Sequence, residues 1–341
     1  MKKIALITDA WYPQVNGVVR VTDTVRSILA ARGYEVLVID PSSFTSVTIP
    51  FYREIRLALF PARQLNRILS DFKPDAIHLQ SEGPLGFAAR RYCRKNKLPF
   101  TTWYHTHFHF YLDMRLKGLR RVVMSVARRF HNSSVRTFVS TESLKKELEG
   151  QRFTNLAVVP LGVDTELFKR NLAPPVPPMQ KPVYVFFSRL AQEKNPEAFL
   201  QLQLQGTKLV IGDGPDREEL EQKYPDATFV GYKKGQELVD YLSSADVMVF
   251  PSRTETFGLA ALEALACGVP VAAHDVLGPR DIITEGVDGY LSDDLAEAAQ
   301  KCLTLDREAC RTKALKFSWE HSADAFLKNL APIDNNKTES K

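Results

Sequence analysis

Short runs of apolar, β-branched residues alternate with longer helical stretches along almost the whole chain, and this alternation constrains the fold most. Before residue 171 the runs are IALIT, EVLVID, DAIHLQ, FTTWYH, TFVST and LAVVPLG. After residue 182 they are VYVFFS, KLVIGDG, TFVGY, DVMVFPS, VPVAAHD and GYLSD. Such alternation predicts parallel strands with helices on both faces of each sheet. The sequence therefore predicts an α/β protein with two Rossmann-like, doubly wound parallel-sheet domains.

The boundary between the two domains is marked by proline. Residues 171–182, NLAPPVPPMQKP, contain five prolines and predict a stiff, extended linker. A length of 341 residues also exceeds what one hydrophobic core usually supports. We expect an N-terminal domain over 1–170 and a C-terminal domain over 183–315. A helix over 316–332 is expected to cross back to the first domain, and residues 333–341 to form a disordered tail.

Charge is distributed unevenly between the two halves. Residues 1–170 hold 27 Lys and Arg against 14 Asp and Glu, whereas residues 171–341 hold 18 against 26. The segment GLRRVVMSVARRFH predicts a basic amphipathic helix in the first half. Its apolar stripe is Leu119, Val122, Val123, Val126 and Phe130, and its basic residues off the stripe are Arg120, Arg121, Arg128 and Arg129.

Two interpretations of this helix remain open. It can lie on an anionic membrane surface, or it can pack against the sheet with its basic face in solvent. Nucleic acid is disfavoured as a partner, because no RNA-binding or DNA-binding motif accompanies the charge.

Cysteine usage and the N-terminus indicate a cytoplasmic protein. Cys93, Cys267, Cys302 and Cys310 show neither metal-ligand spacing nor a disulfide framework, so buried, reduced thiols are expected. The apolar run of MKKIALITDAW ends too soon for a signal peptide or a membrane span, and is expected to be the first strand.

Two carboxylates, Glu255 and Glu263, stand eight residues apart across a predicted strand-to-helix junction. A helix that begins near Phe257 or Gly258 directs unpaired backbone N–H groups and its positive dipole end at whatever precedes it. Gly258 leaves room for a phosphate, while one carboxylate can meet sugar hydroxyls and the other a ribose diol. This arrangement predicts a nucleotide-sugar ligand.

Two cations complete the predicted phosphate site. Arg189 and Lys194 lie in SRLAQEKN, directly after the run VYVFFS, where the carboxyl end of a parallel strand binds ligands. Two fixed cations could hold a diphosphate leaving group. The chain has no DxD motif, so we expect no metal. No GxGxxG follows the first strand, which disfavours an NAD(P)-dependent oxidoreductase, and GDGP at 212–215 is interpreted as a turn.

These motifs, in their order, resemble those of glycosyltransferase family 4, the retaining nucleotide-sugar glycosyltransferases with the GT-B fold. The likeness runs through YPQVNGVVR, EGPLGFAARRYCRKNKLPFTTWYHTHF, PLGVDTELF, SRLAQEKN, IGDGP, FVGY and TETFGLAALEALACGVPV. It implies that two Rossmann-like domains face a cleft, with the domain over 1–170 on the acceptor side and the domain over 183–315 binding the nucleotide sugar. It is closest to bacterial enzymes that glycosylate membrane lipids such as diacylglycerol.

The resemblance also implies roles for individual residues. Arg189 and Lys194 would bind the diphosphate, and Glu263 the ribose. Glu255 would contact the donor sugar, and His105 would face that sugar across the cleft. Further contacts implied with the donor come from Gly17 and the Phe257, Gly258 and Leu259 backbone at the phosphates, and from Val230 and Gly231 at the base. The expected catalytic set is His105, Glu255, Arg189 and Lys194, with no cofactor beyond the donor.

The activity implied is metal-independent, retaining transfer of a hexose to a hydroxyl of a membrane lipid such as diacylglycerol. A UDP-sugar is the favoured donor, and GDP-mannose is the second choice. The enzyme would be peripheral on the cytoplasmic face of the membrane. Alternatives are transfer to a soluble sugar or polyol, and a nucleotide-sugar epimerase on the same scaffold. A non-catalytic membrane-binding protein would leave Arg189, Lys194 and the two carboxylates without a purpose.

Overall fold

The computed structural model describes residues 1–14, 16–49, 52–105 and 120–334. The chain divides into two compact units. The first comprises Met1–Pro160 and the segment that starts at Trp319, and the second is Leu161–Ser318. The proline-rich residues 171–182 therefore lie inside the second unit. Leu119 of the predicted apolar stripe and residues 335–341 of the expected tail lie outside the described residues.

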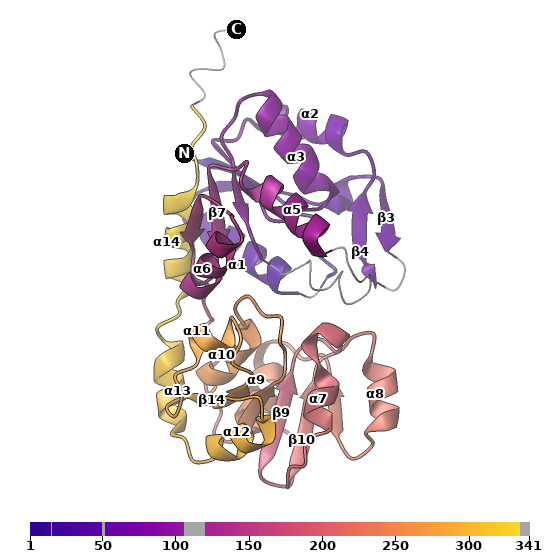
Figure 1. The fold of residues 1–341 in the computed structure, drawn as a ribbon, viewed down its shortest axis with the longest axis vertical. Helices are drawn as coiled ribbons and strands as arrows, with labels where there is room; N and C mark the ends of the chain where they lie inside the picture. The colour runs from indigo at the N-terminus through magenta and orange to yellow at the C-terminus, as the bar shows by residue number, and fades with distance from the viewer. Residues whose placement is uncertain (15, 50–51, 106–119, 335–341) are drawn as a thin grey trace. The chain divides into compact units, whose positions relative to one another are not determined.

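The first unit, whose residues up to 160 are drawn in indigo to magenta in Figure 1, contains a six-stranded parallel sheet in the order β2-β1-β5-β6-β7-β8. Its strands are β1 (Lys3–Ile7), β2 (Glu35–Ile39), β5 (Ala76–Leu79), β6 (Thr101–Trp103), β7 (Arg136–Val139) and β8 (Leu156–Val158). Its helices are α1 (Gly17–Ala31), η1 (Pro41–Ser43), α2 (Ala62–Phe72), α3 (Pro84–Lys95), α5 (Arg120–His131), α6 (Glu142–Gly150) and α14 (Trp319–Asn329).

The second unit repeats this plan with strand order β11-β10-β9-β12-β13-β14, again all parallel. Its strands are β9 (Val183–Phe187), β10 (Thr207–Ile211), β11 (Thr228–Gly231), β12 (Val247–Phe250), β13 (Val271–Ala273) and β14 (Gly289–Leu291). Its helices are η2 (Gln192–Lys194), α7 (Pro196–Leu200), α8 (Arg217–Lys223), α9 (Gly235–Ser244), α10 (Leu259–Ala266), α11 (Pro279–Ile282), α12 (Leu295–Cys302) and α13 (Arg307–Ala314). Every run predicted as a strand forms one, so the predicted fold class is confirmed.

Several helices begin at a side chain that accepts a backbone hydrogen bond in the first turn. Asn16 accepts from the N–H of Val19 at the start of α1, and Thr141 accepts from that of Leu144 at the start of α6. Asp294 plays the same part at α12. Such caps satisfy donors that the helix itself cannot satisfy, typically worth about 1 kcal/mol each. They fix where the chain leaves a strand and turns back over the sheet.

Both faces of the first sheet are covered. On one face, Ala5 and Ile7 of β1 join a buried cluster that includes Leu65 of α2 and Leu85 of α3. On the other face, α14 brings Phe326 against an aromatic group formed by His78, Trp103 and Phe138, with ring centroids 4.9 to 6.0 Å from that of Phe326. Figure 1 shows α14, in yellow, beside the indigo and purple elements of the first unit.

Ion pairs and hydrogen bonds hold α14 in this place. Arg32, just after α1, pairs with Glu320 and Asp324, and Arg136 donates to the carbonyl oxygen of Asn329 at 3.1 Å. Because the Arg32 pairs are exposed, they add less than the burial of Phe326.

An antiparallel hairpin, β3 (Ser46–Ile49) and β4 (Tyr52–Ala58), was not predicted from the sequence. Its run contains Pro50 and charged residues, so it lacks the apolar continuity that marks the parallel strands. The hairpin follows η1, and its strand β4 carries Arg56, which faces Thr48 in the register.

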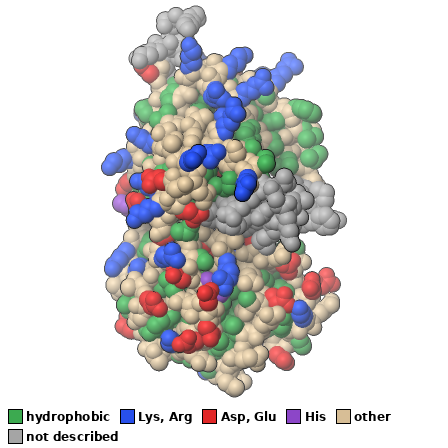
Figure 2. Space-filling view, in the orientation of Figure 1, with side chains coloured by type: hydrophobic (Ala, Val, Ile, Leu, Met, Phe, Trp, Pro, Cys, Tyr) green, Lys and Arg blue, Asp and Glu red, His purple; other side chains and the backbone are tan. Residues whose placement is uncertain are grey.

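The apolar stripe predicted for helix α5 is buried in one part and exposed in another. Phe130 is buried against Phe87, but Val122 is 58% and Val126 46% exposed. Arg121 and Arg129 are also exposed, whereas Arg128 donates to the carbonyl oxygen of Gln151. The helix is thus fixed to the core at its C-terminal end and presents apolar and basic side chains together to solvent. On the face seen in Figure 2, blue Lys and Arg side chains lie among green apolar ones over the first unit.

None of the helices in the described part of the chain combines the length and apolar character needed to cross a bilayer.

Replacing Phe326 with Ala is expected to cost the first unit about 3 to 5 kcal/mol, because it removes a fully buried ring from the aromatic group. All three tryptophans, Trp11, Trp103 and Trp319, belong to this unit, so tryptophan fluorescence during urea unfolding reports on it selectively. The exposed Lys328→Ala on the same helix is the control. Equal midpoints for the two variants would contradict the packing described for α14.

Candidate active site

The predicted phosphate-binding residues of the second unit lie after the carboxyl ends of β9 and β12, two neighbouring strands. Arg189 follows β9, and Lys194 is the last residue of the short helix η2. Glu255 lies in the loop between β12 and α10, and Glu263 in the second turn of α10. Both carboxylates belong to buried residues.

Lys194 and Glu255 form an ion pair, with 2.6 Å between Nζ and Oε1. The side chains are only 24% and 10% exposed, respectively. A carboxylate so shielded from water needs a compensating cation, and the lysine supplies it. The sequence assigned these residues to different parts of the ligand, and did not predict that they touch.

Three side chains tie the two loops together. Ser252 and Thr254 each donate from their hydroxyl to the carbonyl oxygen of Glu193, at 3.3 and 3.4 Å. Asn195 returns a bond from its amide Nδ2 to the carbonyl oxygen of Pro251, at 3.4 Å. These contacts flank Lys194 and Glu255 along the chain, so they set the separation of the ion-paired groups. Sequence reasoning missed all three, because isolated Ser, Thr and Asn residues in loops carry no distinctive pattern.

The junction between β12 and α10 has the form that the sequence predicted. Gly258 precedes the helix with φ +102°, a conformation that an L side chain rarely adopts. The first backbone N–H groups of α10 therefore follow directly from a residue without a Cβ. Phe257 is buried and packs edge-on against Phe317, at 6.1 Å between centroids, while Leu259 is partly buried at the first helical position.

Gly212, in the GDGP segment, allows two loops to approach closely. A Cβ at this position would stand 1.9 Å from the carbonyl oxygen of Ser188, so no other residue fits without moving the backbone. Next to this contact, the N–H of Leu190 donates to the carbonyl oxygen of Asp213 at 2.9 Å. The segment thus supports the loop that carries Arg189.

Val230 and Gly231 end β11, beside β10 in the same sheet. The carbonyl oxygen of Gly231 accepts the N–H of Gly212 at 3.0 Å. The residues expected at the base are therefore joined through the backbone to the segment that supports Arg189.

Gly17 and His105 belong to the first unit. Gly17 is the first residue of α1, next to the capping Asn16. His105 follows β6, stacks on Trp103 at 4.7 Å and shares a 2.6 Å hydrogen bond between its Nε2 and Oε1 of Gln80. Burial of its ring, with a smaller effect of the nearby His131, lowers the pKa of His105 to about 3. His105 is therefore neutral at neutral pH and can act as a hydrogen-bonding group but not as a fixed cation.

Within the described ranges, no group of three or more His, Cys, Asp or Glu side chains is placed to hold a metal ion.

The chain matches two family models that together span most of its length. Residues 15–167 match Glycosyltransferase Family 4, and residues 181–307 match Glycosyl transferases group 1. A GDP-mannose-dependent alpha-mannosyltransferase of Corynebacterium glutamicum is 30% identical over 317 residues, covering 85% of this chain and 76% of the relative. The chain belongs to glycosyltransferase family 4. The resemblance seen in the sequence motifs is confirmed.

Other similarities agree with this membership. The family 4 chain is 26% identical over 371 residues to the alpha-monoglucosyldiacylglycerol synthase of Streptococcus pneumoniae, covering 96% of this chain and 84% of that protein. A sucrose-phosphate synthase from Thermosynechococcus elongatus superimposes with a TM-score of 0.76 at 20% identity, over 96% and 98% of the two chains. This likeness shows the GT-B fold. The protein is a nucleotide-sugar glycosyltransferase that transfers a hexose.

The low pKa of His105 predicts a stability loss in acid. In the unfolded chain a histidine binds its proton near pH 6.5, so stability falls as the pH drops from about 6.5 towards 3, where only the unfolded state takes up this proton. His105→Gln should therefore lose less thermal stability over this range than the unmodified enzyme, as followed by tryptophan fluorescence. The exposed His321→Gln is the control. A difference between His105→Gln and the unmodified enzyme that stays constant with pH would contradict the burial of a neutral imidazole.

Proposed function

We propose that this glycosyltransferase moves a hexose from a nucleotide diphosphate sugar to a hydroxyl of a membrane lipid, with retention of configuration and without a metal. The observation that carries the proposal is the shielded Lys194–Glu255 pair beside the start of α10. Replacing a buried ion pair with apolar residues of similar volume is often neutral or stabilising, so fold stability alone is a weak reason for a chain to keep such a pair. The pair is therefore best explained by a ligand.

The chemistry of the pair suits the two ends of a nucleotide sugar. An ammonium group has three donors, so the lysine that pairs with Glu255 is of a type that can also donate to diphosphate oxygens. The carboxylate has further lone pairs for sugar hydroxyls. Lys194 would thus bind the diphosphate of the leaving group. Its ion pair with Glu255 would also orient that carboxylate towards the sugar hydroxyls.

In this proposal, side chains and backbone N–H groups of the protein neutralise the negative charge of the diphosphate. Arg189 and Lys194 would oppose the negative charge that develops on the leaving group, and the N–H groups at the start of α10 would add hydrogen bonds. Such preorganised donors can do the work for which other transferases use Mg²⁺. Metal independence follows as part of the proposal.

The proposed reaction has one acceptor and one leaving group on the same face of the sugar. The bond from the anomeric carbon to the phosphate oxygen breaks, and a bond from that carbon to the acceptor oxygen forms. The acceptor proton passes to the departing diphosphate. Glu255 is not assigned as a covalent nucleophile, because its ion pair with Lys194 lowers its nucleophilic character.

The donor is the first property to test. The Corynebacterium glutamicum relative carries GDP-mannose in its name, whereas the sequence motifs favoured a UDP-sugar. A thermal-shift panel of UDP, GDP, ADP and their sugars discriminates between these, because a ligand that binds only the folded state raises the melting temperature. No shift with any nucleotide would overturn the proposal.

Arg189→Gln and Lys194→Gln are each expected to lower the transfer rate by roughly a hundredfold or more, because each removes a fixed charge that faces the leaving diphosphate. Rates are measured with the donor identified above and with EDTA present. Lys301→Gln is the control, since this exposed lysine on α12 has its own carboxylate partner, Glu297.

Lys194→Gln also leaves Glu255 without its cation, so a folding defect must be separated from a catalytic one. The double variant Lys194→Gln/Glu255→Gln removes both charges. It should regain thermal stability while remaining inactive. If both single variants transfer sugar at the full rate with EDTA present, the metal-free phosphate assignment is wrong.

The lipid acceptor is proposed from the surface of the first unit. Val122, Val126 and Arg129 lie on one side of α5 at helical spacing, and all three are exposed. Apolar and basic side chains displayed together suit a surface of anionic lipid. The similarity to a synthase named for a glucosyldiacylglycerol product supports the same acceptor class. A soluble sugar or polyol acceptor is the alternative.

We expect that a fourfold variant no longer binds anionic liposomes in a flotation assay. In this variant Val122 and Val126 are changed to Ser, and Arg121 and Arg129 to Gln. Each basic residue near such a surface contributes about 1 kcal/mol to the free energy of membrane binding. The control, Arg63→Gln/Arg67→Gln, removes the same charge from exposed positions on α2. Donor binding should be unchanged in both. Equal retention of the two variants, or no binding by the unmodified enzyme at low salt, would favour the soluble acceptor.

A further inference from the structure

The hydrogen bond between Gln80 and His105 joins two residues that follow neighbouring strands of the first sheet. Gln80 is the first residue after β5, and His105 is the second residue after β6. Gln80 extends the pairing of β5 with β1, because its backbone N–H donates to the carbonyl oxygen of Ile7 at 2.8 Å. Both residues therefore lie at the carboxyl edge of the sheet, where open α/β sheets bind ligands.

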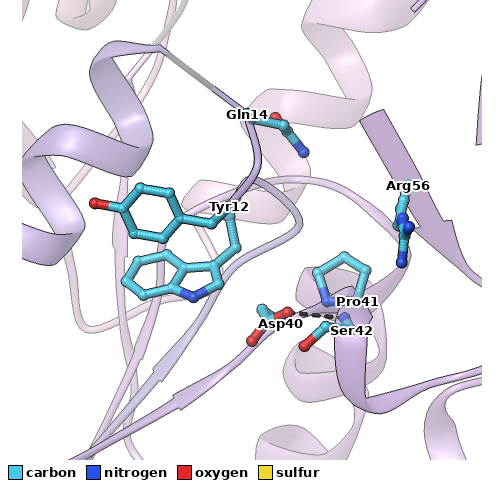
Figure 3. Close-up of a pocket in the computed structure, with 7 residues that line it drawn as sticks. Tyr12, Gln14, Asp40, Pro41, Ser42 and Arg56 are labelled. Atoms are coloured by element: carbon cyan, nitrogen blue, oxygen red, sulfur yellow. Dashed lines mark hydrogen bonds between the residues drawn. The ribbon is translucent and has the colours of Figure 1, made fainter. Parts of the chain in front are cut away.

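The carboxyl ends of β1 and β2, at the same edge, form a different surface. They border a depression of about 20 Å³, which has room for a single water molecule. Figure 3 shows its lining, in which Oδ1 of Asp40 accepts the N–H of Ser42 at 2.8 Å. This contact holds the loop after β2 in place, and the depression is too small for a substrate.

Two contacts fix the imidazole ring of His105. One face of the ring stacks on the indole of Trp103, with 4.7 Å between centroids and 17° between planes. At the edge of the ring, Nε2 lies 2.6 Å from Oε1 of Gln80. Trp103 is fully buried and is itself stacked on Phe326 of α14, with 28° between the ring planes. The imidazole can therefore neither tilt nor turn without losing a contact.

The contact with Gln80 also determines which nitrogen of His105 carries the proton. An amide oxygen can only accept a hydrogen bond, so Nε2 of the imidazole must be the donor. A neutral imidazole with its proton on Nε2 has its lone pair on Nδ1. Burial, with a smaller effect of His131, lowers the pKa of His105 to about 3. The uncharged amide suits this neutral ring, whereas a carboxylate in its place would favour the imidazolium.

Packing alone is a weak reason for a glutamine at position 80. The residue is only 1% exposed, and its Nε2 has no hydrogen-bond partner among the described residues. Unpaired buried donors destabilise a fold, and an apolar side chain of similar size would avoid this one. Within the same part of the chain, the bond from His105 is what the amide of Gln80 provides. This contact therefore explains the polar side chain best.

We propose that Gln80 is the positioning residue of His105, and that it holds the imidazole uncharged, with its proton on Nε2, during sugar transfer. The inference rests on the proposed function, because the family resemblance implies that His105 faces the donor sugar. As the bond to the diphosphate breaks, positive charge develops on the sugar ring. An imidazolium beside that ring would oppose this charge, whereas a neutral imidazole would not.

The protonation of His105 can be observed by 15N NMR on protein labelled at its seven histidines, with the signals of His105 assigned from His105→Gln. At pH 7 we expect a neutral ring that carries its proton on Nε2. Gln80→Glu places a carboxylate at the same atom, so both ring nitrogens should then carry protons. A proton on Nδ1 of His105 in the unmodified enzyme, or a ring unchanged by Gln80→Glu, overturns the inference.

Gln80→Met removes the amide with little change in volume. It is expected to lower kcat about tenfold or more, with the KM for the donor changed less than about threefold. The control is Gln64→Met, which replaces an exposed glutamine of α2 whose amide donates to the carbonyl oxygen of Ser43. This control should leave kcat unchanged. An unchanged kcat in folded Gln80→Met contradicts the inference.

A positioning residue acts only through the group that it positions. In the His105→Gln background, Gln80→Met should therefore change kcat less than about twofold, because no imidazole is left to hold. Losses that multiply in the double variant would show that Gln80 acts independently of His105, and would overturn the inference. Melting temperatures show whether each variant is folded. If Gln80→Met is not, the isosteric Gln80→Glu takes its place in the comparison.

Donor binding separates this inference from the proposed function. The NMR measurement needs neither donor nor acceptor, whereas calorimetric titration of the unmodified enzyme with the nucleotide sugar tests the proposed function alone. If the enzyme binds no nucleotide sugar, the proposed function fails even where His105 is neutral. If donor binding and transfer are intact but kcat does not depend on Gln80 through His105, only the inference is wrong.

Discussion

Burial of both faces of a parallel sheet is the constraint on which the rest of this molecule depends. Residues 4–7 of β1 and residues 247–249 of β12 are completely buried, so these strands have no room for a polar group that meets a ligand. Polar chemistry is displaced to the strand ends, where loops leave the sheet. Three residues follow this rule. Asp40 comes directly after β2, Glu255 lies in the loop after β12, and Lys194 ends the short helix η2 that follows β9.

The loops after the strands of the second sheet are fixed in position by contacts with backbone groups. Glu193 accepts two hydroxyl groups through its carbonyl oxygen, and Gly212 lets a neighbouring loop press against Ser188. The geometry of the Lys194–Glu255 pair is thus a property of the central strands of the second sheet and the loops between them, rather than of one motif. Apolar substitutions under these loops should therefore disturb the pair from a distance.

Much of the fold could be predicted because its signals are local. Continuous apolar runs marked every strand of the two parallel sheets, and the junction at Gly258 was visible as a glycine before a helical pattern. The Lys194–Glu255 pair could not be predicted, since its members are 61 residues apart and meet only when β9 and β12 lie side by side. The exposure of Val122 and Val126 was equally hidden, because a helical wheel shows which residues share a face but not what covers it. The hairpin that carries Arg56 lacked a clear strand signal.

The position of α14 has a consequence for biosynthesis. The ribosome makes most of the first unit, then all of the second, and only then the helix that covers His78, Trp103 and Phe138. The second unit is continuous in sequence and can complete its core during translation, whereas one face of the first sheet must wait. That face is rich in aromatic side chains, so the nascent chain exposes an apolar, aggregation-prone surface. The exposure lasts while the ribosome synthesises the roughly 160 residues of the second unit. Chaperone binding during this interval would have a defined target.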